Sequence, residues 1–264
     1  MNKNAKIIVI SGGSAGLGKE LVKLSAAADH IVINLSRSNP SCCEHHIACD
    51  VASTESIKTA VNKIAETYGR VDILINNAGL GISGATELLP DDEVKKVLDV
   101  DYLGALRLTR AILPHMHKKS KIINISSACA LFALPYRGVY CSAKAAMNML
   151  SYSMRMELAR YGIRVVAICP GEIKTGFTAN RLKFSETNEK YGGSPALSAE
   201  AIDKNDHKRM KAAKAAQKIY RIALRKNGTL YIVGAKYKFF AFMQRLLPIG
   251  MFNGIINRIF NKRK

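Results

Sequence analysis

Three side chains with complementary chemistry occur within a short span of the sequence: Ser127, Tyr140 and Lys144. Tyr140 and Lys144 are four residues apart in a helical stretch that extends to Tyr161, so they share one face of that helix. A phenol with a pKa near 10 is a poor base, but an ammonium about 4 Å away stabilises the phenolate by roughly 4 kcal/mol and lowers that pKa by about three. We therefore expect Tyr140 to exchange a proton with a substrate oxygen, which Ser127 orients and polarises.

A glycine-rich segment near the N-terminus predicts a phosphate site. It follows the apolar stretch 7–10 and precedes a stretch of helical character. Glycines permit a tight turn and a close approach of the backbone to a pyrophosphate, and the helix N-terminus offers unpaired N–H groups and a positive dipole end. The residues expected at this site are Ser11, Gly12, Ser14, Gly16, Leu17 and Gly18.

The end of the second apolar stretch bears on the choice of nucleotide. A carboxylate there would accept hydrogen bonds from an adenosine ribose, but this chain has Ser36 and Arg37 instead. Arg37 can pair with a 2′-phosphate, with Ser14 and Ser36 as further donors. Asp50 and Val51 end the third apolar stretch, where an adenine ring would lie. We expect NADP(H) in preference to NAD(H); the alternative is that Arg37 is a solvated surface residue.

The elements that must position these residues form a regular alternation. Short apolar stretches at 7–10, 31–35, 47–49, 71–75, 122–125, 165–168 and 230–233 are separated by helical patterns. Continuous apolar strands between helices are typical of a parallel sheet covered on both faces, with ligands at the carboxyl ends of the strands. The sequence predicts a doubly wound parallel sheet of the Rossmann type, an α/β domain over residues 1–234 with a mobile flap at about 176–198.

Together, these motifs resemble the short-chain dehydrogenase/reductase family from residue 6 to about residue 176. The resemblance is carried by residues 11–18, Asn76-Asn77-Ala78-Gly79, Ser127, Tyr140 with Lys144, and Pro170-Gly171 through Thr175. It implies hydride transfer between a nicotinamide and a carbonyl or hydroxyl carbon. It also implies that the cofactor is contacted by Tyr140, Lys144, Asn77, Ala78, Gly79, Pro170, Gly171, Ile173 and Thr175. Family members commonly form homodimers through the helices after the fourth and fifth strands, so a homodimer is implied.

One residue departs from the family pattern Val-Asn-x-x-Gly. This chain has Val100-Asp101-Tyr102-Leu103-Gly104, so Asp101 replaces an Asn that supports a water linked to the catalytic Lys. An Asp buried without a positive partner has a raised pKa, and in its protonated form it is nearly isosteric with Asn. We expect that Asp101 is a catalytic residue and that the protein keeps an altered activity. The alternative is that Asp101 is a helix residue whose side chain faces solvent.

The C-terminal part of the chain combines positive charge with apolar residues. The net charge is +20, and no acidic residue follows Asp206, whereas fifteen Lys or Arg do. Phe and aliphatic side chains are interleaved with these charges, which is typical of a segment that lies on an anionic membrane surface. The mixture is too interrupted for a membrane span and suits lipid better than nucleic acid. We expect a basic amphipathic extension over residues 235–264 and a cytoplasmic protein that is peripheral on a membrane.

No metal or disulfide framework is expected. The six cysteines have no regular spacing and the first apolar stretch is too short for a signal peptide, which favours reduced cytoplasmic thiols. A local cluster of thiols and imidazoles lacks the spaced pairs that zinc takes; its members are Cys42, Cys43, His45, His46 and Cys49.

The resemblance also bears on the substrate. Residues 77–81, 97–100, 134–135 and 139–144 are similar to the 17β-hydroxysteroid and retinol dehydrogenase branch, whose members act on bulky apolar alcohols and ketones. It implies a hydrophobic substrate such as a steroid, retinoid or lipid, in contact with Ser127, Leu131, Leu134, Tyr140 and Phe177. Two alternatives stay open: a 3-oxoacyl or 3-ketosphinganine-type reductase, and a protein that binds NADP(H) at a membrane as a sensor without catalysis.

Overall fold

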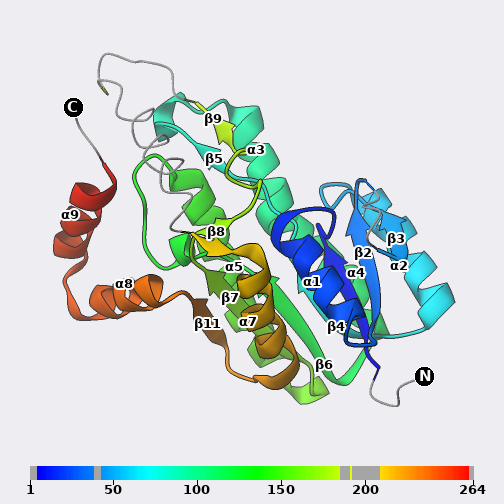
Figure 1. Cartoon of the computed structure of the whole chain (residues 1–264). Coiled ribbons are helices and arrows are strands. Elements are labelled where there is room, and N and C mark those ends of the chain that lie inside the picture. The colour runs from blue at the N-terminus through cyan, green and yellow to red at the C-terminus, as the bar shows by residue number, and fades with distance from the viewer. Residues whose placement is uncertain (1–4, 39–42, 185–190, 192–208, 262–264) are drawn as a thin grey trace.

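A computed structural model describes residues 5–38, 43–184, 191 and 209–261. Its centre is a sheet of seven parallel strands in the order β11-β7-β6-β4-β1-β2-β3 (Figure 1). The strands are β1 (Ile7–Ser11), β2 (Ile31–Ser36), β3 (His45–Ala48), β4 (Val71–Asn76), β6 (Met116–Ile125), β7 (Arg164–Pro170) and β11 (Leu230–Val233). The strand order reverses beside β1, as in a doubly wound Rossmann-type sheet, so the predicted fold is confirmed.

Helices cover both faces of this sheet. On one face lie α2 (Thr54–Tyr68), α4 (Ala105–Ile112) and α5 (Gly138–Glu157), and on the other lie α1 (Gly16–Ala26) and α7 (Ala212–Arg225) (Figure 1). The remaining longer helices are α3 (Asp91–Leu98), α8 (Ala235–Leu246) and α9 (Ile249–Phe260). Two short strand pairs join β5 (Ile82–Ser83) to β9 (Leu182–Lys183) and β8 (Ile173–Lys174) to β10 (Met210–Lys211).

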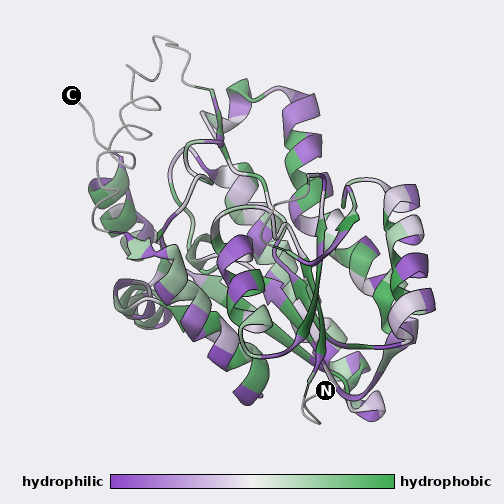
Figure 2. Cartoon of the chain, turned by 45° about the vertical axis from the view of Figure 1, so that its right-hand side comes forward, coloured by the Kyte–Doolittle hydropathy of each residue, from purple (hydrophilic) through white to green (hydrophobic). Residues whose placement is uncertain are grey.

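The core divides into two apolar clusters because the central strands are buried on both faces. In β1, Ile7 and Val9 point into one cluster and Ile8 and Ile10 into the other, as the two-residue repeat of a strand requires. Figure 2 shows the strands as predominantly apolar and the outer faces of the flanking helices as polar. This burial on both sides is why each strand appears in the sequence as an uninterrupted apolar stretch.

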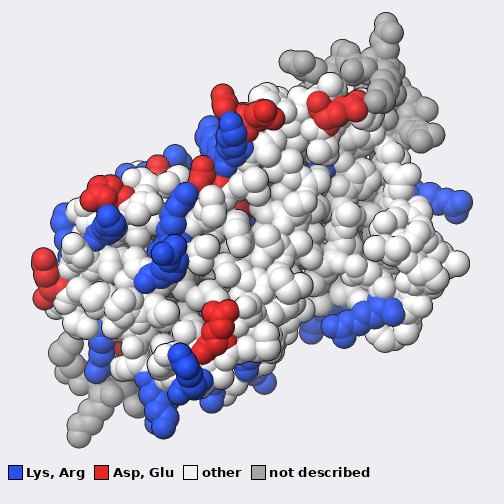
Figure 3. All heavy atoms as spheres, turned by 180° about the vertical axis from the view of Figure 1, so that it is seen from behind, with Lys and Arg blue, Asp and Glu red and all other residues white. Residues whose placement is uncertain are grey.

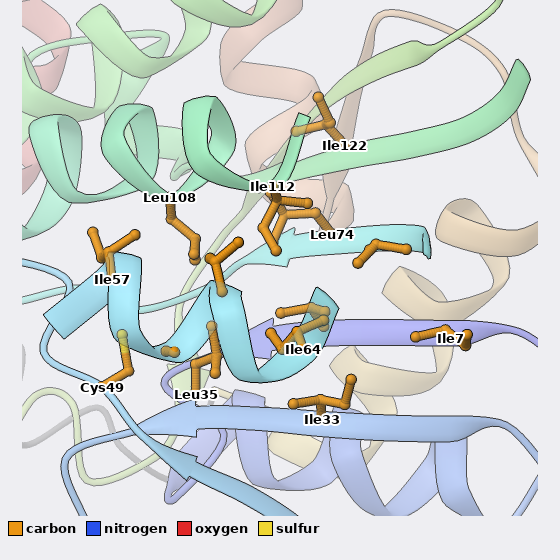
Figure 4. Packing of buried hydrophobic residues seen from close by; sticks show 14 of the residues in the cluster. Ile7, Ile33, Leu35, Cys49, Ile57, Ile64, Leu74, Leu108, Ile112 and Ile122 are labelled. Atoms are coloured by element: carbon orange, nitrogen blue, oxygen red, sulfur yellow. The ribbon is translucent and has the colours of Figure 1, made fainter. Parts of the chain in front are cut away.

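Helix α2 illustrates how a flanking helix is fixed. Its start is capped by Ser53, whose hydroxyl accepts a hydrogen bond from the Ser56 N–H, and it ends at Gly69 in the left-handed conformation, with φ of 70°. Its buried residues recur at helical spacing, and Ile57 and Ile64 face the sheet in the cluster shown in Figure 4.

Two predicted boundaries were wrong. Strand β6 starts at Met116, six residues before the apolar stretch, because its first half is polar and partly exposed and carries no apolar signal. The predicted helix from 140 to 161 begins at Gly138 and ends at Glu157, followed by a 3₁₀ turn over Ala159–Tyr161. Most of the predicted flap, residues 185–190 and 192–198, lies outside the described residues.

The C-terminal helices lie beyond β11 at the edge of the sheet (Figure 1). They are joined to the body by a third apolar cluster, in which Phe252 and Ile256 of α9 pack against Ala128 and Phe132. Phe252 is only 1% exposed. In the described part of the chain, no helix is both long enough and apolar enough to cross a membrane.

Candidate active site

A cavity of about 720 Å³ lies at the carboxyl ends of the central strands. Of the residues predicted to bind a cofactor, it is lined by Gly12, Ser14, Gly16, Leu17, Gly18, Ser36, Arg37, Asp50, Val51, Asn77, Ala78, Gly79, Tyr140, Lys144, Pro170, Gly171, Ile173 and Thr175. The fold thus brings six separate segments of the sequence to one cavity, at the edge where doubly wound sheets bind their ligands.

The glycine-rich turn has the backbone that the sequence predicts. Gly12 and Gly16 have φ of 69° and 52°, a conformation that residues with a Cβ rarely adopt. A Cβ on Gly18 would overlap the carbonyl of Gly12 and the side chain of Asn77. Asn77 Nδ2 donates to the carbonyl oxygens of Ser11 and Gly12 at 3.0 and 3.1 Å, which fixes the turn. The turn and the N-terminus of α1 leave N–H groups for a pyrophosphate, so these residues fit a dinucleotide.

Ser11 does not line the cavity. Its hydroxyl accepts hydrogen bonds from the N–H groups of Asn77 and Ala78, at 3.0 and 3.1 Å, and so ties the glycine-rich turn to the end of β4. A residue that the sequence analysis missed acts in a similar way. Asn34 Oδ1 accepts from the Gly13 N–H at 2.9 Å. The only indication of this role in the sequence is that Asn34 is a polar residue within the otherwise apolar stretch of β2.

At the end of β2, the two predicted phosphate donors differ in whether they are available to bind a ligand. Arg37 is exposed and lines the cavity. The Ser36 hydroxyl, however, accepts from Asn34 Nδ2 at 2.9 Å and donates to the Ser38 carbonyl at 2.8 Å, so its proton is already used within the chain. Asp50 Oδ1 accepts from the Ala52 N–H at 2.9 Å, which shapes the turn after β3.

The catalytic residues predicted from the sequence meet at one wall of the cavity. Ser127 follows β6, and Tyr140 and Lys144 lie on the first turns of α5. Lys144 is 4% exposed, and its Nζ lies 5.8 Å from the centre of the Tyr140 ring and donates to the Ile125 carbonyl at 3.3 Å. This arrangement places a hydroxyl, a phenol and an ammonium around one position for a substrate oxygen.

Asp101 lies behind Lys144, in a π-helical turn over Asp99–Gly104 that joins α3 to α4. Such turns are rare and are frequently found at functional sites. Asp101 is 1% exposed, which excludes the solvent-facing alternative, and its Oδ1 accepts from the Leu80 N–H at 2.5 Å. The expectation that it has no positive partner was wrong: its Oδ2 lies 3.1 Å from Lys144 Nζ. Burial raises the pKa of Asp101, as expected, while the Lys144 charge and the hydrogen bond from Leu80 act in the opposite direction. With Lys144 Nζ at 3.1 Å, Asp101 forms a carboxylate–ammonium pair in place of the protonated form expected from the sequence.

The expected lowering of the Tyr140 pKa was also wrong for this structure. Burial raises the pKa of Tyr140, the Asp101 charge adds to that rise, and a hydrogen bond with Ser127 opposes it. The main reason is that the buried ring loses the water that would solvate a phenolate; in addition, the Asp101 carboxylate, 3.1 Å from Lys144 Nζ, repels that phenolate. At neutral pH the phenol of Tyr140 therefore carries its proton.

A buried network of polar side chains connects the strands and helices that carry the catalytic residues. Asn76 Nδ2 donates to Thr109 Oγ1 at 2.9 Å and to Asn124 Oδ1 at 2.8 Å, and Asn124 Nδ2 donates to Ser151 Oγ at 2.8 Å. These bonds join β4, β6, α4 and α5 and pair most of the polar atoms in this network, which would be costly to bury alone; Asn76 Oδ1 has no partner among the residues that the structure describes. No spacing or motif in the sequence indicates the roles of Thr109, Asn124 and Ser151.

The substrate side of the cavity is only partly as predicted. Leu134 and Phe177 line it, and the Phe177 ring lies 6.0 Å from the Tyr140 ring. Leu131 does not line it and packs instead against the C-terminal cluster. Tyr237 of α8 and Phe260 of α9 line the cavity and were not predicted, because nothing in the sequence indicates that the tail folds back to this site.

The cluster of thiols and imidazoles near residue 45 shows no metal geometry. His46 Nε2 is bonded to the Ser36 carbonyl at 2.9 Å, and the His45 ring packs edge-on against Tyr68. Cys42 lies outside the described residues. Within the described parts of the chain, no three His, Cys, Asp or Glu residues are grouped so as to hold a metal ion.

Comparison with known proteins agrees with this site. Residues 6–186 match the family model described as short chain dehydrogenase. The chain is 36% identical over 228 residues to a 3-ketodihydrosphingosine reductase of Bacteroides thetaiotaomicron, covering 84% of this chain and 85% of that protein. It is 29% identical to the rat dehydrogenase/reductase SDR family member 7B, covering 98% and 82%. Among solved structures, a short-chain dehydrogenase from Streptomyces avermitilis superposes with a TM-score of 0.81 at 27% identity, covering 93% of each chain.

The fold and the site therefore define an oxidoreductase that binds a nicotinamide cofactor. The chain belongs to the short-chain dehydrogenase/reductase family, as the sequence motifs implied.

Proposed function

We propose that this protein interconverts a ketone and a secondary alcohol, or an aldehyde and an alcohol, on a hydrophobic, lipid-like substrate with NADP(H). One observation carries the proposal: Ser127, Tyr140 and Lys144 line the same cavity as the glycine-rich turn, and the C-terminal helices add Tyr237 and Phe260 to its wall. The relative named 3-ketodihydrosphingosine reductase supports a ketone on a long carbon chain.

Reduction is the direction that the charges around Tyr140 favour. When bound, reduced nicotinamide supplies the hydride. The Tyr140 hydroxyl donates its proton to the substrate oxygen as that oxygen becomes an alkoxide, and the Ser127 hydroxyl donates a hydrogen bond to the same oxygen. A phenol with a raised pKa holds its proton until this step. In the reverse direction Tyr140 must first lose its proton, which the negative charge of Asp101 opposes.

The preference for NADP(H) rests on Arg37. It is exposed at the end of β2 and lines the cavity, and no acidic residue stands at positions 36–38 to bind a ribose hydroxyl. A charge-assisted bond contributes about 1.5–3 kcal/mol, so Arg37→Ala is expected to raise KM for NADPH by about 10- to 100-fold and to leave KM for NADH unchanged. Arg110→Ala, an exposed Arg away from the cavity, is the matched control. Equal effects on both cofactors would contradict this role.

The substrate class is tested by following NADPH consumption with wild-type protein. The panel contains a steroid ketone, retinaldehyde, a 3-oxoacyl thioester, 3-ketodihydrosphingosine and small polar carbonyls. Turnover of the hydrophobic compounds at kcat/KM at least about 100-fold above the small ones supports the proposal. Turnover of small polar carbonyls alone would refute it. Tight NADPH binding without turnover of any compound would favour the sensor alternative.

We also propose that α8 and α9 rest on an anionic membrane surface. Their exposed apolar residues are Phe239, Phe242, Leu246, Ile249, Met251, Ile255 and Ile259. Lys and Arg occur between them and no Asp or Glu does, and the rear view in Figure 3 shows basic side chains at this end of the molecule. Because these helices also line the cavity, contact with lipid would bring the cavity close to a membrane-soluble substrate.

Sedimentation with vesicles tests this surface. Wild-type protein is expected to bind vesicles that contain anionic lipid, less so at high salt, and to bind neutral vesicles weakly. Phe239→Ser with Phe242→Ser should reduce binding, since both residues are more than half exposed and contribute no core packing. Tyr161→Ser, at a position 54% exposed and away from α8 and α9, is the control. Binding that is unaffected by the double substitution would contradict the proposal.

The homodimer implied by the family is also proposed here. Met149 and Met156 are 66% and 74% exposed and lie seven residues apart on one face of α5, one of the helices that family members use for dimerisation. Light scattering is expected to give the mass of a dimer for the wild type and of a monomer for Met149→Lys with Met156→Lys. A wild-type monomer would contradict this expectation.

A further inference from the structure

A buried arginine lies in the wall of the cavity, three residues before the catalytic tyrosine. Arg137 precedes the first turn of α5 and is 9% exposed. Its backbone is held on both sides: its N–H donates to the Leu134 carbonyl at 3.3 Å, and its carbonyl accepts from the Cys141 N–H at 2.9 Å. The position of this side chain is therefore set by the same turn that places Tyr140.

The guanidinium of Arg137 has an unused donor. Its Nη2 is buried and makes no hydrogen bond to any residue that the structure describes. No ion pair joins it to a carboxylate of the described chain either. Glu172 lines the same cavity but is hydrogen-bonded to Tyr237. A buried cationic donor without an acceptor is costly, so a ligand that supplies one would be bound more tightly.

Arg137 is also close to the reacting centre. Burial raises the pKa of Tyr140, and the positive charge of Arg137 acts against that rise, which places the guanidinium within electrostatic reach of the phenol. Arg137 and Tyr140 also line the same cavity. A substrate whose ketone reaches Tyr140 would therefore bring the atoms next to that ketone toward Arg137.

We propose that Arg137 determines substrate specificity by donating a hydrogen bond to a second oxygen of the substrate, close to the ketone that is reduced. The planar guanidinium suits an oxygen acceptor such as an acyl carbonyl or a hydroxyl. This names the substrate class within the proposed function, on which it rests: a long-chain ketone that bears an oxygen function beside the ketone. A 3-oxoacyl thioester and 3-ketodihydrosphingosine both have such an oxygen, whereas a plain long-chain ketone has none.

The test compares substrates as well as variants. Wild-type protein, Arg137→Met and Arg137→Lys are assayed with NADPH on a 3-oxoacyl thioester, on 3-ketodihydrosphingosine and on a plain 3-ketone of the same chain length. Arg137→Met is expected to lower kcat/KM by about 10- to 100-fold for at least one oxygen-bearing substrate and by less than about threefold for the plain ketone. Arg137→Lys should restore part of the loss because it keeps a charged donor.

The two oxygen sources are distinguished by which substrate is sensitive to the variant. A loss confined to the thioester identifies the acyl carbonyl, and a loss confined to 3-ketodihydrosphingosine identifies its hydroxyl. Equal losses on all three substrates, or a wild-type enzyme that reduces the plain ketone as well as the others, would overturn the proposal. NADPH affinity and melting temperature, measured for each variant, reveal a merely structural role. If the wild type reduces none of the three ketones, this proposal fails, whereas the proposed function fails only if the steroid ketone and retinaldehyde of the panel are not reduced either.

Discussion

Replacement of Asp101 by Asn tests how a buried charge sets the acid strength of Tyr140. Asp101 takes the position where the family has a neutral Asn, and its Oδ2 lies 3.1 Å from Lys144 Nζ. The carboxylate acts on Tyr140 in two ways. It repels the phenolate directly, and it pairs with the ammonium that would otherwise stabilise the phenolate. Asp101→Asn removes both effects, so the pKa of Tyr140 falls.

The size of the change follows from the geometry. Lys144 Nζ lies 3.1 Å from Asp101 Oδ2 and 5.8 Å from the centre of the Tyr140 ring. A unit charge roughly 7 Å from the phenol, at an effective dielectric near 20, contributes about 2.4 kcal/mol, which corresponds to a pKa change of about 1.7. Alcohol oxidation needs the phenolate, so below the pKa its rate should rise by about 10- to 50-fold in the variant. Ketone reduction needs the phenol and should change by less than about threefold at pH 7.

The assay is kcat/KM as a function of pH in both directions. For Asp101→Asn, the alkaline fall of reduction and the rise of oxidation should both move to lower pH. Asp99→Asn is the matched control, because Asp99 lies in the same π-helical turn but is bonded to Arg107 at the surface, at 3.0 Å. Superimposable profiles for wild type and Asp101→Asn would refute the reasoning. So would a loss of turnover by orders of magnitude in both directions.

Two further predictions concern the cofactor turn and the C-terminal helices. Gly18→Ala should weaken NADPH binding by more than about tenfold in a fluorescence titration, because the added Cβ would overlap the Gly12 carbonyl. Gly250→Ala is the control, because Gly250 has open space around it, and this variant should bind NADPH normally. Equal NADPH affinities of the two variants would contradict the role of the turn. Phe252→Ala should weaken the docking of α9 by about 3–5 kcal/mol and speed hydrogen exchange of its amides. Phe239→Ala, at a position 58% exposed, should leave that exchange unchanged. Unchanged exchange in α9 of Phe252→Ala would contradict the packing.

The fold was predictable because its signals are local. A strand that is buried on both faces is apolar throughout, and all seven predicted stretches became strands of one sheet. The start of β6 was not predicted because its first five residues, from Met116 to Ser120, include two lysines and a histidine, which are exposed and give no apolar signal. The glycine-rich turn, Tyr140 and Lys144 were likewise found because the spacing within one turn or one helix indicates their geometry.

The parts of the site that were missed depend on tertiary contacts. Lys144 and Asp101 are 43 residues apart on different helices, so no spacing shows that they form a pair. Tyr237 packs against Gly171 just after β11, and Phe260 lies at the end of α9, which Phe252 anchors on the body of the domain. Arg137 was missed for another reason: a single Arg beside a helix start is ordinarily a surface residue, and only its burial distinguishes it.

The central claim is that Tyr140 transfers the proton that completes ketone reduction. The most direct test measures NADPH consumption by the wild type and Tyr140→Phe with whichever hydrophobic ketone the panel identifies, together with NADPH affinity for each protein. The account predicts a loss in kcat of about 10²- to 10⁴-fold with unchanged NADPH affinity. Turnover by Tyr140→Phe within about threefold of the wild type would contradict it.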